Sequence, residues 1–381
     1  MNIGIIGVGK LGLAYALVFE ESGFSVFASS YKQEYVDKLC AKDVYTVEPG
    51  VQELFESSTN IEYTTDNNLV IQNCEYIYVM VATPSNPDGS YNVDAVESVV
   101  EDFVNYPGDV SNKRLIIGST VNPGDCVRLQ ARLRSRGVTL LYSPTFVAQG
   151  SVLDRIYNPV GVLWGTEDPE IAEECISIWD KFHKITADTT VVKHTTAEIL
   201  KIAFNCWSTM RMSFFNSIGQ LAIKSGVSED MDKINYSINE YNKQWTGFGY
   251  GFGGPCLPRD NRAMVHYARS IGSDYVLGDV VDKFNIDHSK FLAQWITEQN
   301  TDNLPFYFDY LTYKPGVNLP DEASQFAVCK HLLEAGHTVY VKPSEFLPEE
   351  FIEALAQYNT VHYESNFDLQ EKNIDFYTVN I

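Results

Sequence analysis

The chain has 381 residues, of which 45% are hydrophobic and 13% are aromatic, so it can build two or three domains with real cores and is not a disordered chain. Its formal net charge of −22 argues against binding to nucleic acid or to an anionic membrane, because both partners require a basic surface. No apolar run is long enough to cross a bilayer and the N-terminus lacks a basic signal region, so we expect a soluble protein of the cytoplasm.

The first half of the chain alternates short apolar runs with helical patterns. We expect strands at 2–7, 24–28, 75–81, 114–118, 138–142 and 160–164, and helices at 11–22 and 33–41. Buried strands that alternate with helices are typical of a parallel, doubly wound sheet of the Rossmann-like α/β class.

The pattern changes at residue 195, where a segment without proline predicts one helix over 195–225, with Thr195 or Thr196 as its N-cap. A helix of about 30 residues spans roughly 45 Å, which suits a spine that joins two domains. Further elements are a helix at 260–270, a strand-like run at 305–313, a helix at 322–335 and a strand at 337–341. The chain therefore divides into an N-terminal α/β domain (1–193), a helical middle domain (194–298) and a smaller C-terminal α/β domain (299–381).

The seven cysteines are odd in number and scattered, without a CxxC pair. This spacing argues against a disulfide framework and against a zinc site, and we expect no metal. Most of the seven are predicted to be small buried apolar residues. They are Cys40, Cys74, Cys126, Cys175, Cys206, Cys256 and Cys329.

The segment GVGKLG (7–12) fits the pattern GxGxxG between the first strand and the first helix. In this context Gly7 permits a tight turn, Gly9 lets a pyrophosphate approach the backbone, and Gly12 lets helix and strand pack closely. The segment predicts a dinucleotide site, and the alternative is a glycine-rich turn without a ligand.

The end of the second strand lacks the acid that normally holds the adenosine ribose. Ser29 and Ser30 stand where an aspartate is expected, and Lys32 is close by. Without the acid, a serine and a lysine could bind a 2′-phosphate. NAD is the favoured cofactor and NADP is the alternative.

The segment TGFGYGFGGPCLPRD (246–260) places Cys256 in the most backbone-permissive part of the chain, because its glycines and prolines oppose both helix and strand. Two readings are open at this point. Cys256 is a reactive thiol in a loop that folds around a ligand, or it is a buried structural cysteine near a turn.

The part GFGGPCLPRD (251–260) closely resembles the active-site motif GFGGxCxPKD of the nucleotide-sugar dehydrogenases of the UDP-glucose/GDP-mannose type, with Arg259 in place of the lysine. Further matches to this family occur in the same order along the chain. They are GVGKLG (7–12), EPG (48–50), VATP (81–84), DGSYN (88–92), STVNPG (119–124), SPTF (143–146) and EILKIAFN (198–205). The resemblance covers roughly residues 1–275 well and is looser beyond, where YKPG (313–316) corresponds to FKPG.

The resemblance implies a four-electron oxidation of the C6 alcohol of a nucleotide sugar, with UDP-glucose favoured. Cys256 matches the nucleophile of the family, which forms a thiohemiacetal and then a thioester. Lys201 matches the residue that stabilises the oxyanion, with Asn205 as its partner one helical turn later. Asp260 matches the acid that activates water or orients Lys201, and Thr120 matches a residue that holds a water near the reacting carbon. A lysine is rarely buried without a function or a partner, and Lys201 stands among apolar residues of the predicted helix. The alternative is that Lys201 is an ordinary solvated residue of that helix.

The same resemblance implies two sets of binding residues. Those for the cofactor are Gly7, Gly9, Lys10, Leu11, Gly12, Ser30, Lys32, Thr83, Pro84 and Thr120. Those for the substrate are Phe146, Val147, Gln149, Lys201, Asn205, Phe248, Tyr250, Gly251, Gly253 and Lys314. It also implies a homodimer through the long helix, and a C-terminal domain that closes over the nucleotide.

Two departures bear on the chemistry. The family segment SPEFLREG reads SPTFVAQG here, so Thr145 and Gln149 replace two glutamates, and a threonine cannot take up a proton near neutral pH. The C-terminal arginine of the family also has no counterpart in VNLPDEAS (317–324). The alternatives are therefore a divergent enzyme that stalls as a thioester or stops after two electrons, and a non-catalytic protein that binds nucleotide sugars.

Overall fold

The computed structural model describes residues 1–147, 149–242, 246–379 and 381. By its internal contacts the chain forms two compact units, Met1–Ile202 and Ala203–Ile381. The division into three domains at residues 193 and 298 stays a prediction.

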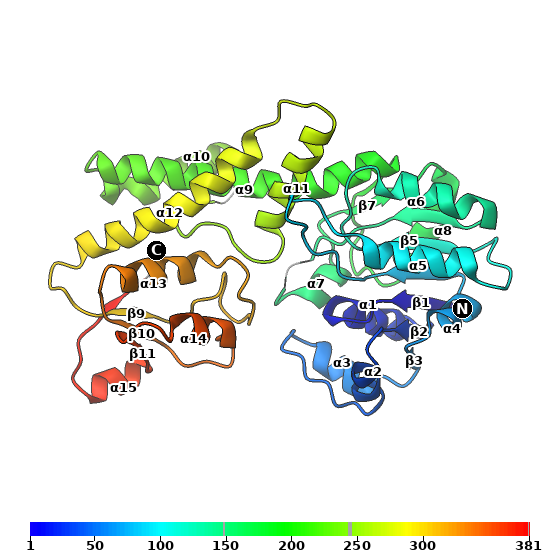
Figure 1. Ribbon diagram of the computed structural model, residues 1–381, viewed down its shortest axis with the longest axis horizontal. Helices are drawn as coiled ribbons and strands as arrows, with labels where there is room; N and C mark the ends of the chain where they lie inside the picture. Colours follow the sequence, from blue (N-terminus) through cyan, green and yellow to red (C-terminus); the bar gives the residue numbers. More distant parts are fainter. Residues whose placement is uncertain (148, 243–245, 380) are drawn as a thin grey trace. The chain divides into compact units, whose positions relative to one another are not determined.

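The first unit contains an eight-stranded sheet of order β3-β2-β1-β4-β5-β6-β7-β8. Strands β1, β2, β3, β5 and β7 are labelled in Figure 1. Its strands are β1 (Asn2–Ile6), β2 (Ser25–Ser29), β3 (Ile61–Thr64), β4 (Tyr76–Val79), β5 (Arg114–Ile117), β6 (Thr139–Tyr142), β7 (Val162–Gly165) and β8 (Thr189–Val192). Its helices before the long one are α1 (Lys10–Glu21), α2 (Gln33–Cys40), α3 (Val51–Ser57), α4 (Asn67–Asn73), α5 (Asp94–Asn105), α6 (Asp125–Leu133), α7 (Val152–Tyr157) and α8 (Pro169–Trp179), with a short 3-10 helix at Arg134–Arg136.

The predicted doubly wound sheet is confirmed, with one difference in strand direction. Along the sheet, all neighbouring strands from β3 through β2, β1, β4 and β5 to β6 pair in parallel. Strands β7 and β8 are also parallel to each other, but β7 pairs antiparallel to β6 through Tyr142 and Gly165. The order reverses between β1 and β4, and ligands of such sheets bind at the carboxyl ends of the strands beside this point.

The core of the first unit is rich in aromatic side chains. Trp179 meets Phe19, Tyr78 and Trp164 edge to face, with ring centroids 5.2, 5.5 and 5.4 Å apart. Edge-to-face pairs stabilise a core by about 0.5–1.5 kcal/mol each beyond the burial of apolar surface. This packing holds α1 and α8 against the sheet.

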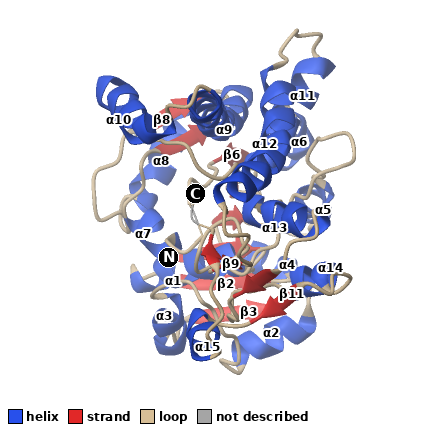
Figure 2. Cartoon of the chain, turned by 90° about the vertical axis from the view of Figure 1, so that its left-hand side faces the viewer, coloured by secondary structure: helices blue, strands red, loops and turns tan. Residues whose placement is uncertain are grey.

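The long helix α9 (His194–Lys224) confirms the helix predicted at 195–225. It begins in the first unit and continues into the second, which contains a 3-10 turn (Ser228–Asp230), α10 (Met231–Asn242), α11 (Leu257–Ser270) and α12 (Leu277–Gln299). Figure 2, which is coloured by secondary structure, shows the helical character of this middle segment.

The rest of the second unit is a small sheet of order β11-β10-β9-β12 with parallel pairing throughout. Its elements are β9 (Phe306–Phe308), α13 (Ser324–Glu334), β10 (Val339–Val341), α14 (Glu349–Leu355), β11 (Val361–Tyr363), α15 (Asn366–Glu371) and β12 (Tyr377–Thr378). The predicted small C-terminal α/β region is therefore confirmed. Its core joins the sheet to α12 and α13 through buried residues such as Leu292, Phe306 and Leu332.

Candidate active site

The glycine turn between β1 and α1 has the geometry of a dinucleotide site. Gly7 adopts φ +100°, and a Cβ atom there would lie 2.7 Å from the backbone of Met80. A Cβ atom on Gly12 would lie 2.3 Å from the carbonyl oxygen of Gly7, whereas a Cβ atom on Gly9 would meet nothing within 4 Å. Two glycines are thus required by close packing, and the third leaves the backbone at the start of α1 open to a diphosphate.

Around this turn lie other residues predicted to bind the cofactor. Lys10 is exposed at the first position of α1, and Leu11 follows it half-buried. After β4, Thr83 is buried and Pro84 is exposed, and the carbonyl oxygen of Pro84 accepts a hydrogen bond from the N–H of Asn92 at 2.7 Å.

The two serines at the end of β2 differ in their surroundings. Ser29 is buried, and its hydroxyl donates to Asn67 Oδ1 at 2.6 Å. Ser30 is half-buried just after the strand, and Lys32 follows exposed at the N-cap of α2, with its Nζ 5.5 Å from the Tyr31 ring centroid. Ser30 therefore follows directly after the carboxyl end of β2, and Lys32 places a positive charge two residues later.

The loop after β5 carries Thr120, which is half-buried next to Ser119. The Ser119 hydroxyl donates to the carbonyl oxygen of Val81 at 2.6 Å, which joins this loop to the end of β4. Both loops therefore lie at the carboxyl edge of the sheet, where the cofactor of a Rossmann-like fold binds.

The buried carboxylate of Glu198 connects α9 to the same loop. Glu198 is 0% exposed and accepts hydrogen bonds from the N–H groups of Gly124 at 2.6 Å and Cys126 at 2.8 Å, at the start of α6. Burial raises the pKa of this carboxyl group. Sequence reasoning assigned no role to Glu198, although an acid among the apolar residues of EILKIAFN was a usable signal.

Lys201, one turn further along α9, is buried with 8% exposure. Its Nζ donates to the carbonyl oxygen of Thr145 at 2.8 Å and lies 4.7 Å from the Phe146 ring centroid. Its burial removes the solvated-residue alternative. Val147 and Gln149 follow half-buried in the same segment, and Ala148 between them lies outside the described residues.

In the second unit, Cys256 is exposed at the N-cap of α11, which is incompatible with a buried structural cysteine. A guanidinium nitrogen of Arg259, one turn later, lies 3.9 Å from the Cys256 sulfur. Helix N-termini and neighbouring cations both favour the thiolate form of a cysteine. The position therefore suits a nucleophile.

A buried carboxylate completes this part of the site. Asp260 is 0% exposed, accepts a hydrogen bond from Asn205 Nδ2 at 2.6 Å, and lies 3.2 Å from Arg259 Nε. The structure thus brings together Cys256, Asp260 and Asn205 with Arg259 in one constellation of the second unit. The sequence singles out Cys256, Asp260 and Asn205, and it marks Arg259 only as the replacement for a lysine of the motif.

The glycines before Cys256 are required by close neighbours rather than by a need for mobility. A Cβ atom on Gly251 would lie 2.3 Å from Asn285 Oδ1, and one on Gly253 would lie 2.3 Å from the carbonyl oxygen of Glu322. A Cβ atom on Gly254, which has φ +83°, would lie 3.1 Å from the ring of Tyr313, so the motifs GFGGPC and YKPG lie together. Lys314 of the second motif is half-buried, and its carbonyl oxygen accepts from the Thr312 hydroxyl at 2.9 Å.

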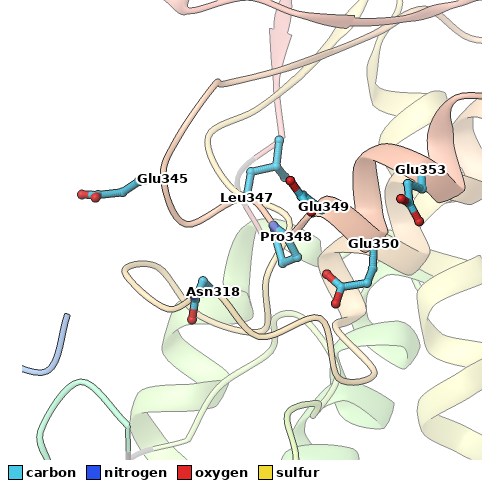
Figure 3. A pocket seen from close by; sticks show the side chains of 7 residues that line it. All are labelled: Asn318, Glu345, Leu347, Pro348, Glu349, Glu350 and Glu353. Carbon is cyan, nitrogen blue, oxygen red and sulfur yellow. The ribbon is translucent and has the colours of Figure 1, made fainter. Parts of the chain in front are cut away.

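A separate hollow of about 500 Å³ lies in the C-terminal region and is strongly acidic (Figure 3). Its lining includes Asn318 and the carboxylates of Glu345, Glu349, Glu350 and Glu353. Carboxylates repel a phosphate group, so this hollow does not suit the diphosphate of a nucleotide.

Two kinds of feature are absent from the part of the chain that the structure describes. Among the described residues, none of the helices combines the length and the apolar character that a membrane-crossing segment requires. Within the same part of the chain, histidine, cysteine and carboxylate side chains form no cluster of three or more that could hold a metal ion.

The fold and the glycine turn define a protein of the Rossmann-like α/β class, and the sequence matches assign it to a family. Residues 1–183 match the NAD binding domain of the UDP-glucose/GDP-mannose dehydrogenase family, and residues 195–287 match its central domain. These matches span well over half of the chain. The protein therefore belongs to the UDP-glucose/GDP-mannose dehydrogenase family, whose NAD binding domain it shares, and it is a nucleotide-sugar dehydrogenase by family.

Individual relatives agree with this assignment. The chain is 25% identical over 351 residues to UDP-glucose 6-dehydrogenase of Pseudomonas aeruginosa, covering 88% of this chain and 77% of that protein. It is 26% identical to the enzyme of the same name from Rickettsia felis, covering 90% of this chain and 78% of the other.

Solved structures share the fold. A UDP-glucose dehydrogenase from Pyrobaculum islandicum matches with a TM-score of 0.84 at 22% identity, covering 99% of this chain and 89% of the other. A UDP-D-ManNAc dehydrogenase from Pyrococcus horikoshii matches with a TM-score of 0.79 at 18% identity, covering 97% and 86%. At these identities the likeness concerns the fold, and it does not choose between substrates.

Proposed function

We propose that this protein is an NAD-dependent nucleotide-sugar 6-dehydrogenase that oxidises a C6 alcohol to a carboxylate through a covalent bond to Cys256, with UDP-glucose as the favoured substrate. The observation that carries the proposal is the exposed Cys256 thiol at the N-cap of α11, 3.9 Å from Arg259 and next to the buried pair of Asp260 and Asn205. A thiol at this position can add to an aldehyde and carry it to an acyl group, which the second oxidation of the proposed reaction requires.

The proposed reaction has four steps. NAD held at the turn of Gly7, Gly9 and Gly12 would supply the acceptor for a hydride from C6. With loss of that hydride, and of the hydroxyl proton to solvent, the alcohol becomes an aldehyde. The Cys256 sulfur adds to the aldehyde carbon while the aldehyde oxygen takes up a proton, which gives a thiohemiacetal. Loss of a hydride, for which a second NAD would be the acceptor, and of a proton to solvent then gives a thioester. Water then cleaves the carbon–sulfur bond, which releases the carboxylate and restores the thiol. Two hydrides leave for each sugar, so two reduced cofactors form.

The protein groups have distinct parts in this scheme. The Lys201 ammonium stabilises the oxygen that becomes negative when sulfur or water adds to carbon, with Asn205 as a further donor. Asp260 takes up the proton of the attacking water, and Thr120 holds a water near C6. Gly7, Gly9 and Gly12 shape the turn that holds the cofactor diphosphate.

A second candidate function follows from Thr145. This residue stands where the family has a glutamate, and its hydroxyl cannot act as a base near neutral pH. If Asp260 does not supply that base, the reaction stops at the thioester. Rapid mixing of enzyme, sugar and NAD distinguishes the two, because full turnover continues linearly, whereas the stalled form ends after one burst and leaves the acyl group on Cys256, detectable by mass spectrometry.

The cofactor preference is expected to be NAD, in agreement with the NAD binding domain of the family. The absence of an acid at Ser30 and the charge of Lys32 favour tolerance of NADP. Measuring kcat/KM with each cofactor at saturating UDP-glucose tests this point.

The substrate is tested with a panel of UDP-glucose, GDP-mannose and UDP-N-acetylmannosamine, which are the substrate types that the names of the relatives indicate. We expect the highest kcat/KM with UDP-glucose. If another member of the panel gives the highest rate of NAD reduction, the proposed substrate changes and the proposed reaction stands. If no member gives reduction of NAD, the result favours a protein that binds nucleotide sugars without turning them over.

We also propose a homodimer through α9, which spans 31 residues. Trp207, Phe214 and Leu221 are seven residues apart and 51%, 52% and 61% exposed, so they form an apolar stripe along one face of the helix. Phe214→Glu and Leu221→Glu should reduce the mass in solution from dimer to monomer by light scattering. The exposed Gln294→Glu on α12 is the control with the same change of charge.

The proposal includes the three predicted domains. In it, the C-terminal domain contacts the nucleotide of the substrate, with Lys314 as one of the contacting residues. A cytoplasmic location is part of it as well. The described residues contain no disulfide bond, as is usual in a reducing compartment.

A further inference from the structure

The loop that carries Cys256 is held by side chains from α9 on one side. Asn216, which is 2% exposed, accepts the N–H of Gly249 at 3.0 Å and donates from Nδ2 to the carbonyl oxygen of Tyr250 at 3.3 Å. Gly219, one turn later, makes room for the Phe248 ring, because a Cβ atom there would lie 2.0 Å from Phe248 Cδ2. A glycine inside a helix costs about 1 kcal/mol relative to alanine elsewhere, and here it has a packing reason.

Helix α12 contributes a second and tighter set of contacts. Asn285 accepts the N–H of Phe252 at 2.8 Å and donates to the carbonyl oxygen of the same residue at 2.8 Å. The side-chain amide thus pairs with Phe252 as a neighbouring strand would, and only an amide offers both a donor and an acceptor in this way.

One turn later on α12, His288 holds Gly249. Its Nδ1 lies 2.8 Å from Gln220 Nε2, and its Nε2 lies 2.8 Å from the carbonyl oxygen of Gly249. With Gln220 as donor, His288 is neutral and gives its Nε2 proton to Gly249. Burial lowers the pKa of His288, which keeps this neutral form.

Contacts from the segment before and at the start of α13 complete the set. The Ser324 hydroxyl accepts the N–H of Gly251 at 3.0 Å, and the carbonyl oxygen of Asp321 accepts the N–H of Gly254 at 2.8 Å. The backbone from Gly249 to Gly254 is therefore fixed from three helical regions immediately before Cys256.

We propose that Asn285, supported by His288, is a positioning residue that fixes the loop so that the Cys256 thiol stays at the N-cap of α11 beside Arg259. The glycine-rich backbone has little preference of its own, so its conformation has to be imposed by neighbours. The Asn285 side-chain amide bonds both the N–H and the carbonyl oxygen of Phe252, and so it fixes the backbone conformation four residues before Cys256. The part of this inference that concerns turnover rests on the proposed function, whereas the part that concerns the thiol does not.

The test compares the intact wild-type protein with Asn285→Leu, Asn285→Asp and a control, Gln294→Leu, which alters an exposed residue of the same helix. Hydrogen exchange of the Phe252 amide reports the loop, and the pH dependence of Cys256 alkylation by iodoacetamide, followed on its own peptide, reports the thiol. Thermal midpoints within a few degrees of the wild type show that the variants fold.

For Asn285→Leu we expect exchange of the Phe252 amide to be about tenfold faster or more. The alkylation midpoint should rise toward about 8.5, the ordinary value for a thiol, because a loosened loop releases the first turn of α11. Asn285→Asp keeps the acceptor and loses the donor, so it should fall between Asn285→Leu and the wild type, and the control should match the wild type. With UDP-glucose and NAD, kcat should fall about tenfold to a hundredfold while KM for NAD changes little.

An unchanged alkylation midpoint in Asn285→Leu would overturn the inference, whatever happens to the exchange rate. If the midpoint rises but the wild-type protein reduces no cofactor with any sugar, the proposed function fails and the positioning role stands. If the midpoint rises and kcat is unchanged, the position of the thiol does not limit turnover and the catalytic part is overturned.

Discussion

Replacing Glu198 by alanine should destabilise the first unit markedly. In the structure, the Glu198 carboxylate accepts hydrogen bonds from the N–H groups of Gly124 and Cys126, and the change removes both acceptor oxygens. Each buried donor left without a partner costs about 1–3 kcal/mol, so the free energy of unfolding should fall by about 2–6 kcal/mol. For a unit of this size that corresponds to a drop of about 4–24 °C in the midpoint of thermal unfolding measured by calorimetry.

The control is Glu173→Ala, at an exposed position of α8, which should shift stability by no more than about 0.5 kcal/mol. Glu198→Gln retains one acceptor and should lose about half as much as the alanine variant. A midpoint for Glu198→Ala that equals the control would refute the view that this carboxylate holds α6 and α9 together.

The pH dependence of the same variants gives a second check with a defined sign. Burial raises the pKa of Glu198 from its ordinary value of 4.5, so the folded state holds the proton more strongly than the unfolded state does. Stability from this group is therefore present below pH 4.5 and is lost as pH rises toward the raised pKa. Between about pH 5 and about pH 8, the wild type should lose more stability in urea unfolding than Glu198→Gln, and an equal loss would contradict the assignment.

Two further predictions concern the cofactor end. Gly12→Ala should abolish NAD binding in calorimetric titration and lower the thermal midpoint, because its Cβ atom would lie 2.3 Å from the carbonyl oxygen of Gly7. A Cβ atom on Gly9 would meet nothing within 4 Å, so Gly9→Ala should weaken NAD binding and leave the thermal midpoint unchanged. If both variants lowered the thermal midpoint equally, close packing at Gly12 would not explain the difference between the two glycines. Ser30→Asp should lower kcat/KM with NADP at least about tenfold while that with NAD stays or improves, since a carboxylate repels a 2′-phosphate. An unchanged ratio would show that Ser30 does not face the adenosine ribose.

The fold could be predicted largely because its signals are local. Alternating apolar runs indicate the Rossmann-like sheet, and the uninterrupted segment after residue 194 indicates α9 within one residue at each end. The antiparallel pairing of β7 with β6 was not foreseen, because strand direction depends on how a connection crosses the sheet and leaves no periodic signal. Helices α10 and α12 fell within a predicted helical region without individual bounds.

The candidate site was predictable where chemistry is concentrated in one motif. Cys256 and Asp260 stand in a single segment, and Lys201 and Asn205 stand one turn apart on α9. Asn285 and His288 could not be found in this way, because their partners in the loop are 33 and 39 residues away and the contact exists only after folding. The backbone-permissive character of the glycine-rich segment also did not reveal that Gly251 and Gly253 are enclosed by close neighbours.

The most direct test of the central claim is the number of reduced cofactors formed per UDP-glucose consumed, measured over many turnovers for the wild type and for Cys256→Ser. The account predicts two NADH per sugar in the wild type and no more than one in the variant, which keeps the first hydride transfer but cannot form the thioester. One NADH per sugar in the wild type, or two in Cys256→Ser, would contradict covalent catalysis by Cys256.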